Sequence, residues 1–199
     1  MASSSPSLRV SGLACRRGDR LLFEDVSFDL ASGEALALAG PNGAGKTSLL
    51  RILAGLLEAE AGEVTLAGDA ICLGHLDALK PQMTVAENLA FWVALFGGET
   101  GGIGACLDRF GIARLADLPA GILSAGQRRR LGLARLARFI GAASPRPIWL
   151  MDEPDAALDM QGRAALEALM AEHLAAGGVA VAATHHGLAA ATRRLDLVP

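Results

Sequence analysis

Residues 40–47 read Gly-Pro-Asn-Gly-Ala-Gly-Lys-Thr, and the organisation of the whole chain can be inferred outward from them. Residues 35–39 form a short apolar run directly before a glycine, as a buried strand that leads into a tight turn does. Residues 46–57 carry apolar side chains at the i, i+3, i+4 spacing of a helix. A strand, a glycine-rich turn and a helix in this order match the phosphate-binding loop pattern in full.

The residue types of this loop suit a bound triphosphate. Glycines let backbone N–H groups close around phosphate oxygens, because no Cβ blocks that conformation. The following helix adds the positive end of its dipole. Lys46 would reach the β- and γ-phosphates of ATP, and the Thr47 hydroxyl would ligate Mg²⁺. The predicted nucleotide-binding residues of the loop are Gly40, Pro41, Asn42, Gly43, Ala44, Gly45, Lys46, Thr47 and Ser48. The alternative is a glycine-rich loop without chemistry.

Short strands alternate with helices along the rest of the chain. The predicted strands are 8–14, 21–30, 35–39, 64–67, 148–151, 179–183 and 195–198. A helix is predicted over 160–176, and residues 75–139 are predicted to be mainly helical, with breaks at Pro81, 97–104 and Pro119. This alternation predicts an α/β fold with a largely parallel sheet, into which a helical subdomain is inserted.

Composition limits the function. The 199 residues fit one domain of ordinary size, and the net charge of -3 argues against general nucleic-acid binding. The cysteines Cys15, Cys72 and Cys106 are widely spaced, which favours reduced thiols in a cytosolic protein. The sequence contains no apolar run long enough to span a bilayer, and residues 1–7 lack a signal-peptide pattern. We therefore expect any link to a membrane to come through a partner.

Two acidic residues follow the apolar run at 148–151. Asp152 and Glu153 would stand at the exit of a buried strand, where charges are costly unless they serve a cation or a substrate. We expect Asp152 to bind Mg²⁺ and Glu153 to polarise the water that attacks the γ-phosphate. Capping of a following helix is the alternative role for this pair.

A second anion-binding device is predicted at 123–127, where Leu-Ser-Ala-Gly-Gln precedes a helical pattern at 128–140. Taken alone, Ser124 would be an ordinary N-cap. After the phosphate loop, however, this stretch resembles the signature motif of the ATP-binding-cassette (ABC) family, with Ala125 at the first of its two glycines. The resemblance implies a RecA-like P-loop NTPase core, a small antiparallel β subdomain and a helical subdomain, with boundaries near 1–74, 75–140 and 141–199.

Further motifs of the family follow in the expected order. Residues 153–159 resemble the catalytic acid and D-loop, in which Asp159 is retained. Thr184-His185 resembles the switch-histidine loop, so that His185 would hydrogen-bond the γ-phosphate. The resemblance implies Mg²⁺-dependent ATP hydrolysis by a head-to-tail homodimer, and it assigns Ser124, Gly126, Gln127 and Asp159 to the nucleotide of the partner protomer.

Two stretches depart from the common family pattern. Residues 13–20 lack the usual adenine-stacking aromatic residue, so that Arg16 or Arg17 could stack instead, or the stretch is a solvated turn. His75 stands where a glutamine usually relays the ATP state to a membrane partner, and it could equally be a surface histidine. A third run, Arg-Arg-Arg at 128–130, is predicted to form a solvated face.

Residues 74–80 and 89–92 resemble the haem exporter ATPase branch of the family, which serves cytochrome c maturation. This implies integral membrane partner subunits, a peripheral location at the cytoplasmic face of the bacterial inner membrane, and hydrolysis that drives haem handling, with release of a haem-loaded chaperone. Two alternatives stay open at this point. One is an ABC ATPase of a different transporter, and the other is a soluble P-loop phosphotransferase such as a small-molecule kinase.

Overall fold

The computed structural model describes residues 7–74, 78–140, 147–184 and 188–198. In chain order the strands are β1 (Ser7–Arg17), β2 (Arg20–Leu30), β3 (Ala35–Ala39), β4 (Ala61–Ala67), β5 (Ala70–Leu73), β6 (Ile148–Asp152), β7 (Val179–Ala183) and β8 (Arg193–Asp196). The α-helices are α1 (Lys46–Leu53), α2 (Val85–Leu95), α3 (Ile103–Arg109), α4 (Ala125–Ala137) and α5 (Met160–Ala175). Short 3-10 turns lie at Ala113–Leu115 and Ala120–Ile122.

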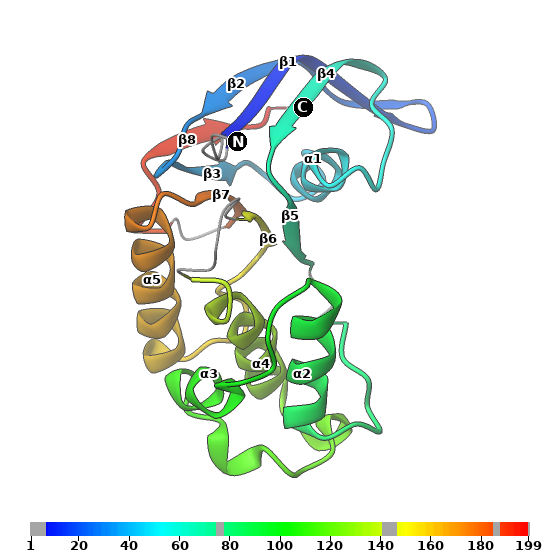
Figure 1. The fold of residues 1–199 in the computed structure, drawn as a ribbon. Helices are drawn as coiled ribbons and strands as arrows, with labels where there is room; N and C mark the ends of the chain where they lie inside the picture. The colour runs from blue at the N-terminus through cyan, green and yellow to red at the C-terminus, as the bar shows by residue number, and fades with distance from the viewer. Residues whose placement is uncertain (1–6, 75–77, 141–146, 185–187, 199) are drawn as a thin grey trace.

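Two sheets make up the upper part of the molecule in Figure 1. The larger sheet has the strand order β5-β6-β7-β3-β8, and its strands pair in parallel. The smaller sheet has the order β2-β1-β4 and is antiparallel. Helix α1 lies between the two sheets, α5 runs beside the larger one, and α2, α3 and α4 gather at the opposite end of the molecule (Figure 1). The predicted α/β class, with a parallel core and a small antiparallel sheet, is confirmed.

Each central strand of the parallel sheet contributes to two hydrophobic cores. Ile148 and Leu150 of β6 pack with α1 and the antiparallel sheet. Trp149 and Met151, which alternate with them, pack with the helices on the other face. All five residues of β6 are buried, and so are all five of β7. Burial on both faces explains why these strands are continuous apolar runs in the sequence.

Several predicted boundaries differ from the structure. Strands β1 and β4 are longer than predicted, and three other elements start or end at different residues. Helix α1 ends at Leu53 instead of residue 57, because Gly55 takes a φ of 68°, outside the helical range. Helix α4 begins at Ala125 instead of residue 128, because Ser124 caps it. Strand β8 is Arg193–Asp196 instead of 195–198, since it is defined by pairing with β3 at the sheet edge and not by an apolar run.

The three cysteines are free thiols in the structure. Cys15 and Cys106 are buried, and Cys72 is half-buried. Burial is the main cause that raises the pKa of each thiol above its usual range. Among the described helices, none combines the length and the apolarity that crossing a membrane requires.

Candidate functional site

The loop at 40–47 joins the end of β3 to the start of α1. Gly45 caps α1 with a φ of 101°, and a Cβ at this position would lie 2.8 Å from Cδ1 of Phe23. A side chain there would therefore be strained and would also collide with β2. The ammonium of Lys46 lies inside the loop, where it donates to the carbonyl oxygens of Gly40 at 2.6 Å and Pro41 at 3.1 Å. Lys46 is only 8% exposed, so its charge is held within the loop.

Thr47 and Asp152 meet at the edge of this loop. The Thr47 hydroxyl donates to a carboxylate oxygen of Asp152 at 2.8 Å, although the two residues are 105 positions apart in the chain. The contact exists because α1 starts, and β6 ends, at the same edge of the parallel sheet. A hydroxyl and a carboxylate at this spacing are oxygen ligands of the kind that Mg²⁺ prefers. The pair predicted to bind the metal is thus brought together.

A cavity of about 360 Å³ opens over the loop. Its lining includes Arg17, Arg20, Asn42, Gly43, Gly45, Lys46, Thr47, Ser48, Asp152 and Glu153. Three cations and two carboxylates in one cavity suit a polyanion that carries a divalent cation. Of the other predicted loop residues, Ala44 is buried, and its N–H donates to the carbonyl of Pro41.

Arg20 was missed in the sequence, where only Arg16 and Arg17 were considered for the nucleotide base. The Arg20 guanidinium lies over the loop, since a Cβ on Gly43 would be 3.8 Å from its Nη1. Arg17 lines the same cavity. Arg16 instead pairs with Glu60 at 3.7 Å. The signal that could have found Arg20 is its place at the end of the β1–β2 turn, beside the two arginines already considered.

Glu153 follows β6 in an unusual backbone conformation. Its φ is 49°, in the left-handed region, which costs a non-glycine residue roughly 1–2 kcal/mol. Its N–H donates to the carbonyl of Ala183 at the end of β7, at 2.9 Å. Strain of this kind persists only where neighbouring groups hold it, and it is common at functional sites. The strained turn carries Glu153 from the end of β6 into the wall of the cavity.

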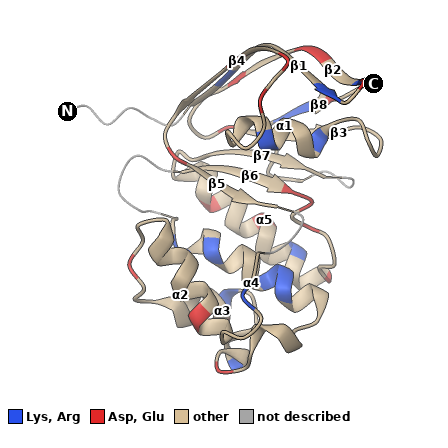
Figure 2. Ribbon diagram, turned by 90° about the vertical axis from the view of Figure 1, so that its right-hand side faces the viewer, with Lys and Arg blue, Asp and Glu red and all other residues tan. Residues whose placement is uncertain are grey.

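The arginine run at 128–130 is not a solvated face, so that prediction is wrong. Arg129 is 3% exposed, and its guanidinium donates to backbone carbonyls at the ends of β5 and β6. Arg128 donates to the carbonyl of Leu123, and Arg130 contacts the Phe110 carbonyl and Asp159. Basic residues line α4 in Figure 2, on the helix that packs beneath the sheet edge. The sequence shows that these residues are charged, but it does not show which groups of other elements pack against the helix that carries them.

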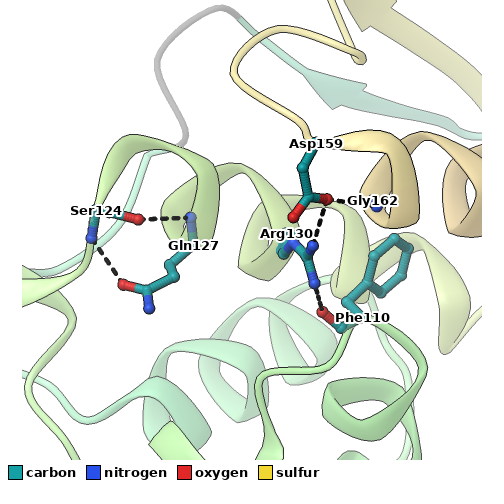
Figure 3. Close-up of polar contacts among 6 residues, drawn as sticks. All are labelled: Phe110, Ser124, Gln127, Arg130, Asp159 and Gly162. Carbon is teal, nitrogen blue, oxygen red and sulfur yellow. Dashed lines mark hydrogen bonds and ion pairs between the residues drawn. The ribbon is translucent and has the colours of Figure 1, made fainter.

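Ser124 and Gln127 form a reciprocal capping box at the start of α4. The Gln127 N–H donates to the Ser124 hydroxyl at 3.3 Å, and the Ser124 N–H donates to Oε1 of Gln127 at 2.8 Å (Figure 3). Gly126 lies against the D-loop, since a Cβ on it would be 2.7 Å from the carbonyl oxygen of Ala157. Ala125 is exposed, which explains why its methyl group is accommodated at the first glycine position of the motif.

Asp159 joins the D-loop to α4. One of its carboxylate oxygens accepts from the Gly162 N–H at 2.8 Å, as an N-cap of α5, and from Arg130 at 2.5 Å (Figure 3). The Gly162 N–H and, after it, Arg130 hold the pKa of Asp159 below its usual range. At the next strand end, the Thr184 hydroxyl donates to buried Asp155 at 3.3 Å. His185 and His75, both named from the sequence, lie outside the described residues.

The two predicted anion-binding stretches line different cavities. Ser124, Gly126, Gln127 and Asp159 line a polar cavity of about 440 Å³, distinct from the one of about 360 Å³ over Lys46. A single copy of the chain therefore has one cavity suited to a triphosphate, over Lys46. It has a second, separate polar cavity at the N-terminus of α4.

Comparisons with known proteins agree with this geometry. A family model described as "ABC transporter" matches residues 23–156. The chain is 51% identical over 195 residues to the cytochrome c biogenesis ATP-binding export protein CcmA of Rhodopseudomonas palustris strain BisB5, covering 94% of this chain and 95% of the relative. It is 47% identical to the CcmA protein of Paramagnetospirillum magneticum, covering 92% of this chain and 89% of the relative. A solved structure from Pyrococcus furiosus, assigned as an ABC transporter ATP-binding protein, has the same fold, with a TM-score of 0.83 at 22% identity over 96% of this chain and 97% of that one.

Proposed function

The chain belongs to the ABC transporter family, and from this premise we propose that it is the ATP-hydrolysing subunit of an export complex in cytochrome c biogenesis. The observation that carries hydrolysis is the contact between Thr47 and Asp152 at 2.8 Å beside buried Lys46. The export role rests on the names of relatives that are about half identical over nearly the whole chain.

Binding of ATP begins at the loop around Lys46. The ammonium exchanges its two carbonyl acceptors, Gly40 and Pro41, for oxygens of the β- and γ-phosphates. The loop N–H groups and the start of α1 hold the same oxygens. Arg17 and Arg20 extend the positive lining toward the nucleoside, where the planar guanidinium of Arg17 is our candidate for stacking on adenine.

Thr47 and Asp152 fit a magnesium ion, since both present oxygen atoms at the cavity edge. An Mg²⁺ ion held by these two residues would neutralise charge on the β- and γ-phosphate oxygens. Asp152 is 7% exposed, and a carboxylate so buried needs a cation or hydrogen-bond donors. The Thr47 hydroxyl is one such donor, and together with Asp152 it would hold the metal as an oxygen ligand.

Glu153 is the proposed general base. Its carboxylate accepts a proton from the water that attacks the γ-phosphorus, while the bond from that phosphorus to the bridging β-oxygen breaks. Lys46 stabilises the charge that develops on the oxygens, and ADP and phosphate are the products. His185, which lies outside the described residues, is proposed to hydrogen-bond the γ-phosphate.

We propose that the working unit is a head-to-tail homodimer. Support comes from the two separate cavities, because Ser124, Gly126, Gln127 and Asp159 lie apart from Lys46 within one copy. A second copy turned about a two-fold axis would place these residues over the γ-phosphate held by the first. ATP then joins the copies, and its hydrolysis releases them. The helical subdomain, proposed to span about 75–140 between core segments near 1–74 and 141–199, transmits this motion to integral membrane subunits at the cytoplasmic face of the inner membrane.

A Glu153→Gln variant tests the chemistry. We expect it to bind ATP with Mg²⁺ at close to wild-type affinity, to lose turnover by roughly 10²–10⁴-fold, and to elute as a dimer in size-exclusion chromatography when ATP is present. Lys46→Ala should lose affinity for ATP and remain a monomer. Wild-type turnover in the Glu153 variant would show that another group is the base.

Cells test the cellular role. In a strain that lacks the gene for this chain, covalent haem staining of c-type cytochromes should disappear, and the wild-type chain should restore it. The Lys46 and Glu153 variants should fail to restore it at matched protein levels. Normal staining in the deletion strain would refute the role in cytochrome c biogenesis and leave the ATPase assignment intact.

A further inference from the structure

Arg129 occupies a position that the mechanism above does not use. It lies in the second turn of α4, two residues beyond Gln127, and is 3% exposed. Burial of a guanidinium is unfavourable unless its N–H groups find acceptors. A basic side chain placed this deep therefore indicates a specific set of contacts and not a solvated helix face.

The acceptors come from two neighbouring strands of the parallel sheet. Nη1 donates to the carbonyl of Gly74, the residue after β5, at 2.9 Å. Nη2 donates to the carbonyls of Asp152 and Glu153, at the end of β6, at 2.5 Å each. Carbonyl groups at the carboxyl ends of parallel strands point outward with their negative ends, and a planar fork of N–H donors can bridge several of them. A lysine offers one nitrogen and cannot reproduce this bridge.

The contact with Glu153 acts on its strained backbone. The Glu153 N–H is held by Ala183 of β7, and its carbonyl is held by Arg129 of α4. Its φ of 49° lies between these two hydrogen bonds. Because the N–H and the carbonyl of Glu153 are both held by hydrogen bonds, its backbone conformation is fixed. The direction of its side chain therefore depends in part on Arg129.

We propose that Arg129 is a positioning residue, which holds Glu153 in its reactive conformation and links it to the signature helix α4 and to Gly74, where the chain leaves β5 for the helical subdomain. The inference rests on the proposed role of Glu153 as general base. Any movement of α4 or of the chain at Gly74 would then reach the catalytic carboxylate through one side chain. In these contacts Arg129 donates to backbone carbonyls, and it supplies no proton to the reaction.

The test uses the full chain in single-turnover hydrolysis, with protein in excess over Mg-ATP, together with direct measurement of ATP affinity. We expect Arg129→Met to slow hydrolysis by roughly ten- to hundredfold, the effect of a misplacement of about 1 Å or less, while the Kd for ATP stays within about twofold of wild type. Arg129→Lys should recover part of the rate. Arg138→Met is the matched control, because Arg138 is the C-cap of the same helix and its contacts to Glu99 are exposed. The rate of this control should not change.

Two outcomes would overturn the proposal. One is a wild-type rate in a folded Arg129→Met protein, or in Arg129→Gln if the methionine variant does not fold. The other concerns the double variant. If Arg129→Met slowed hydrolysis in the Glu153→Gln background by the same factor as in the wild type, Arg129 would not act through Glu153, because a residue that does so has little further effect once that carboxylate is gone. Failure of the proposed role of Glu153 as general base would look different from failure of this inference, because Glu153→Gln alone would then hydrolyse ATP at the wild-type rate.

Discussion

Replacement of Gly126 by alanine tests the packing between the signature stretch and the D-loop. A Cβ on Gly126 would lie 2.7 Å from the carbonyl oxygen of Ala157, whereas ordinary contact begins at 3.4 Å, so the two segments must separate by 3.4 − 2.7 = 0.7 Å. Overpacking of this size costs about 1–3 kcal/mol. Alanine in place of glycine in a helix returns up to about 1 kcal/mol. With the full helix-propensity gain subtracted, we expect a net loss of up to about 2 kcal/mol in the free energy of unfolding.

Thermal and urea denaturation measure this loss. In a chain of this size, each kcal/mol lowers Tm by about 2–4 °C. The matched control is Gly104→Ala in α3, where an added Cβ meets nothing within 4 Å, so that only the helix-propensity gain remains. The control should be as stable as wild type or slightly more stable.

Turnover of the Gly126→Ala variant should also fall. The displaced D-loop residue, Ala157, lies four positions after Glu153 and two before Asp159, so the strain reaches both ends of the loop. We expect ATP hydrolysis to drop by roughly tenfold or more. A Gly126→Ala variant with the Tm and turnover of wild type would refute the close approach of Gly126 to Ala157. It would also refute the idea that the second glycine position of the signature motif, unlike the first, must lack a side chain.

Three further predictions concern other contacts. Thr47→Val, which removes the hydroxyl but keeps the shape, should raise the Mg²⁺ concentration needed for half-maximal hydrolysis, while Thr47→Ser should behave like wild type in the same titration. Because the folded-state pKa of Asp159 is lowered, first by the Gly162 N–H and then by Arg130, its contribution to stability is present above the ordinary aspartate pKa of about 3.9 and is lost as pH falls through the lowered value. Urea denaturation between about pH 6 and pH 3 should accordingly show a shallower acid loss for Asp159→Asn than for wild type. Trp149 is fully buried and stacks on His173 with ring centroids 3.6 Å apart. Trp149→Ala should therefore lower the free energy of unfolding by about 3–5 kcal/mol in urea denaturation. A loss below about 1 kcal/mol would contradict that packing.

The phosphate loop, the acidic pair and the strand pattern could all be predicted from local sequence. Their signals are local because each depends on residue type within one element. Glycines are needed where the loop turns inward, and apolar runs are needed where parallel strands are buried on both faces. The order of strands and helices then leaves few topologies, so the class of the sheet followed as well.

The contacts between distant segments could not be predicted in this way. Arg128, Arg129 and Arg130 are identical in the sequence, yet one donates to Leu123, one is buried beneath β5 and β6, and one pairs with Asp159. The difference comes from the orientation of α4 under the sheet edge, which is set by packing of the whole core. The same holds for Arg20, whose place over the phosphate loop depends on how β2 packs against that loop, where Leu22 and Phe23 approach Gly45.

The sequence by itself thus determined the kind of chemistry, because a triphosphate cradle needs particular residue types in consecutive positions. Tertiary structure alone decided which groups surround that chemistry: the meeting of Thr47 with Asp152, the backbone of Glu153 tied to α4, and the close approach of Gly126 to Ala157. The physical reason is that short-range conformational preferences act within one element, whereas the direction of a side chain toward a distant partner depends on the packing of all elements together.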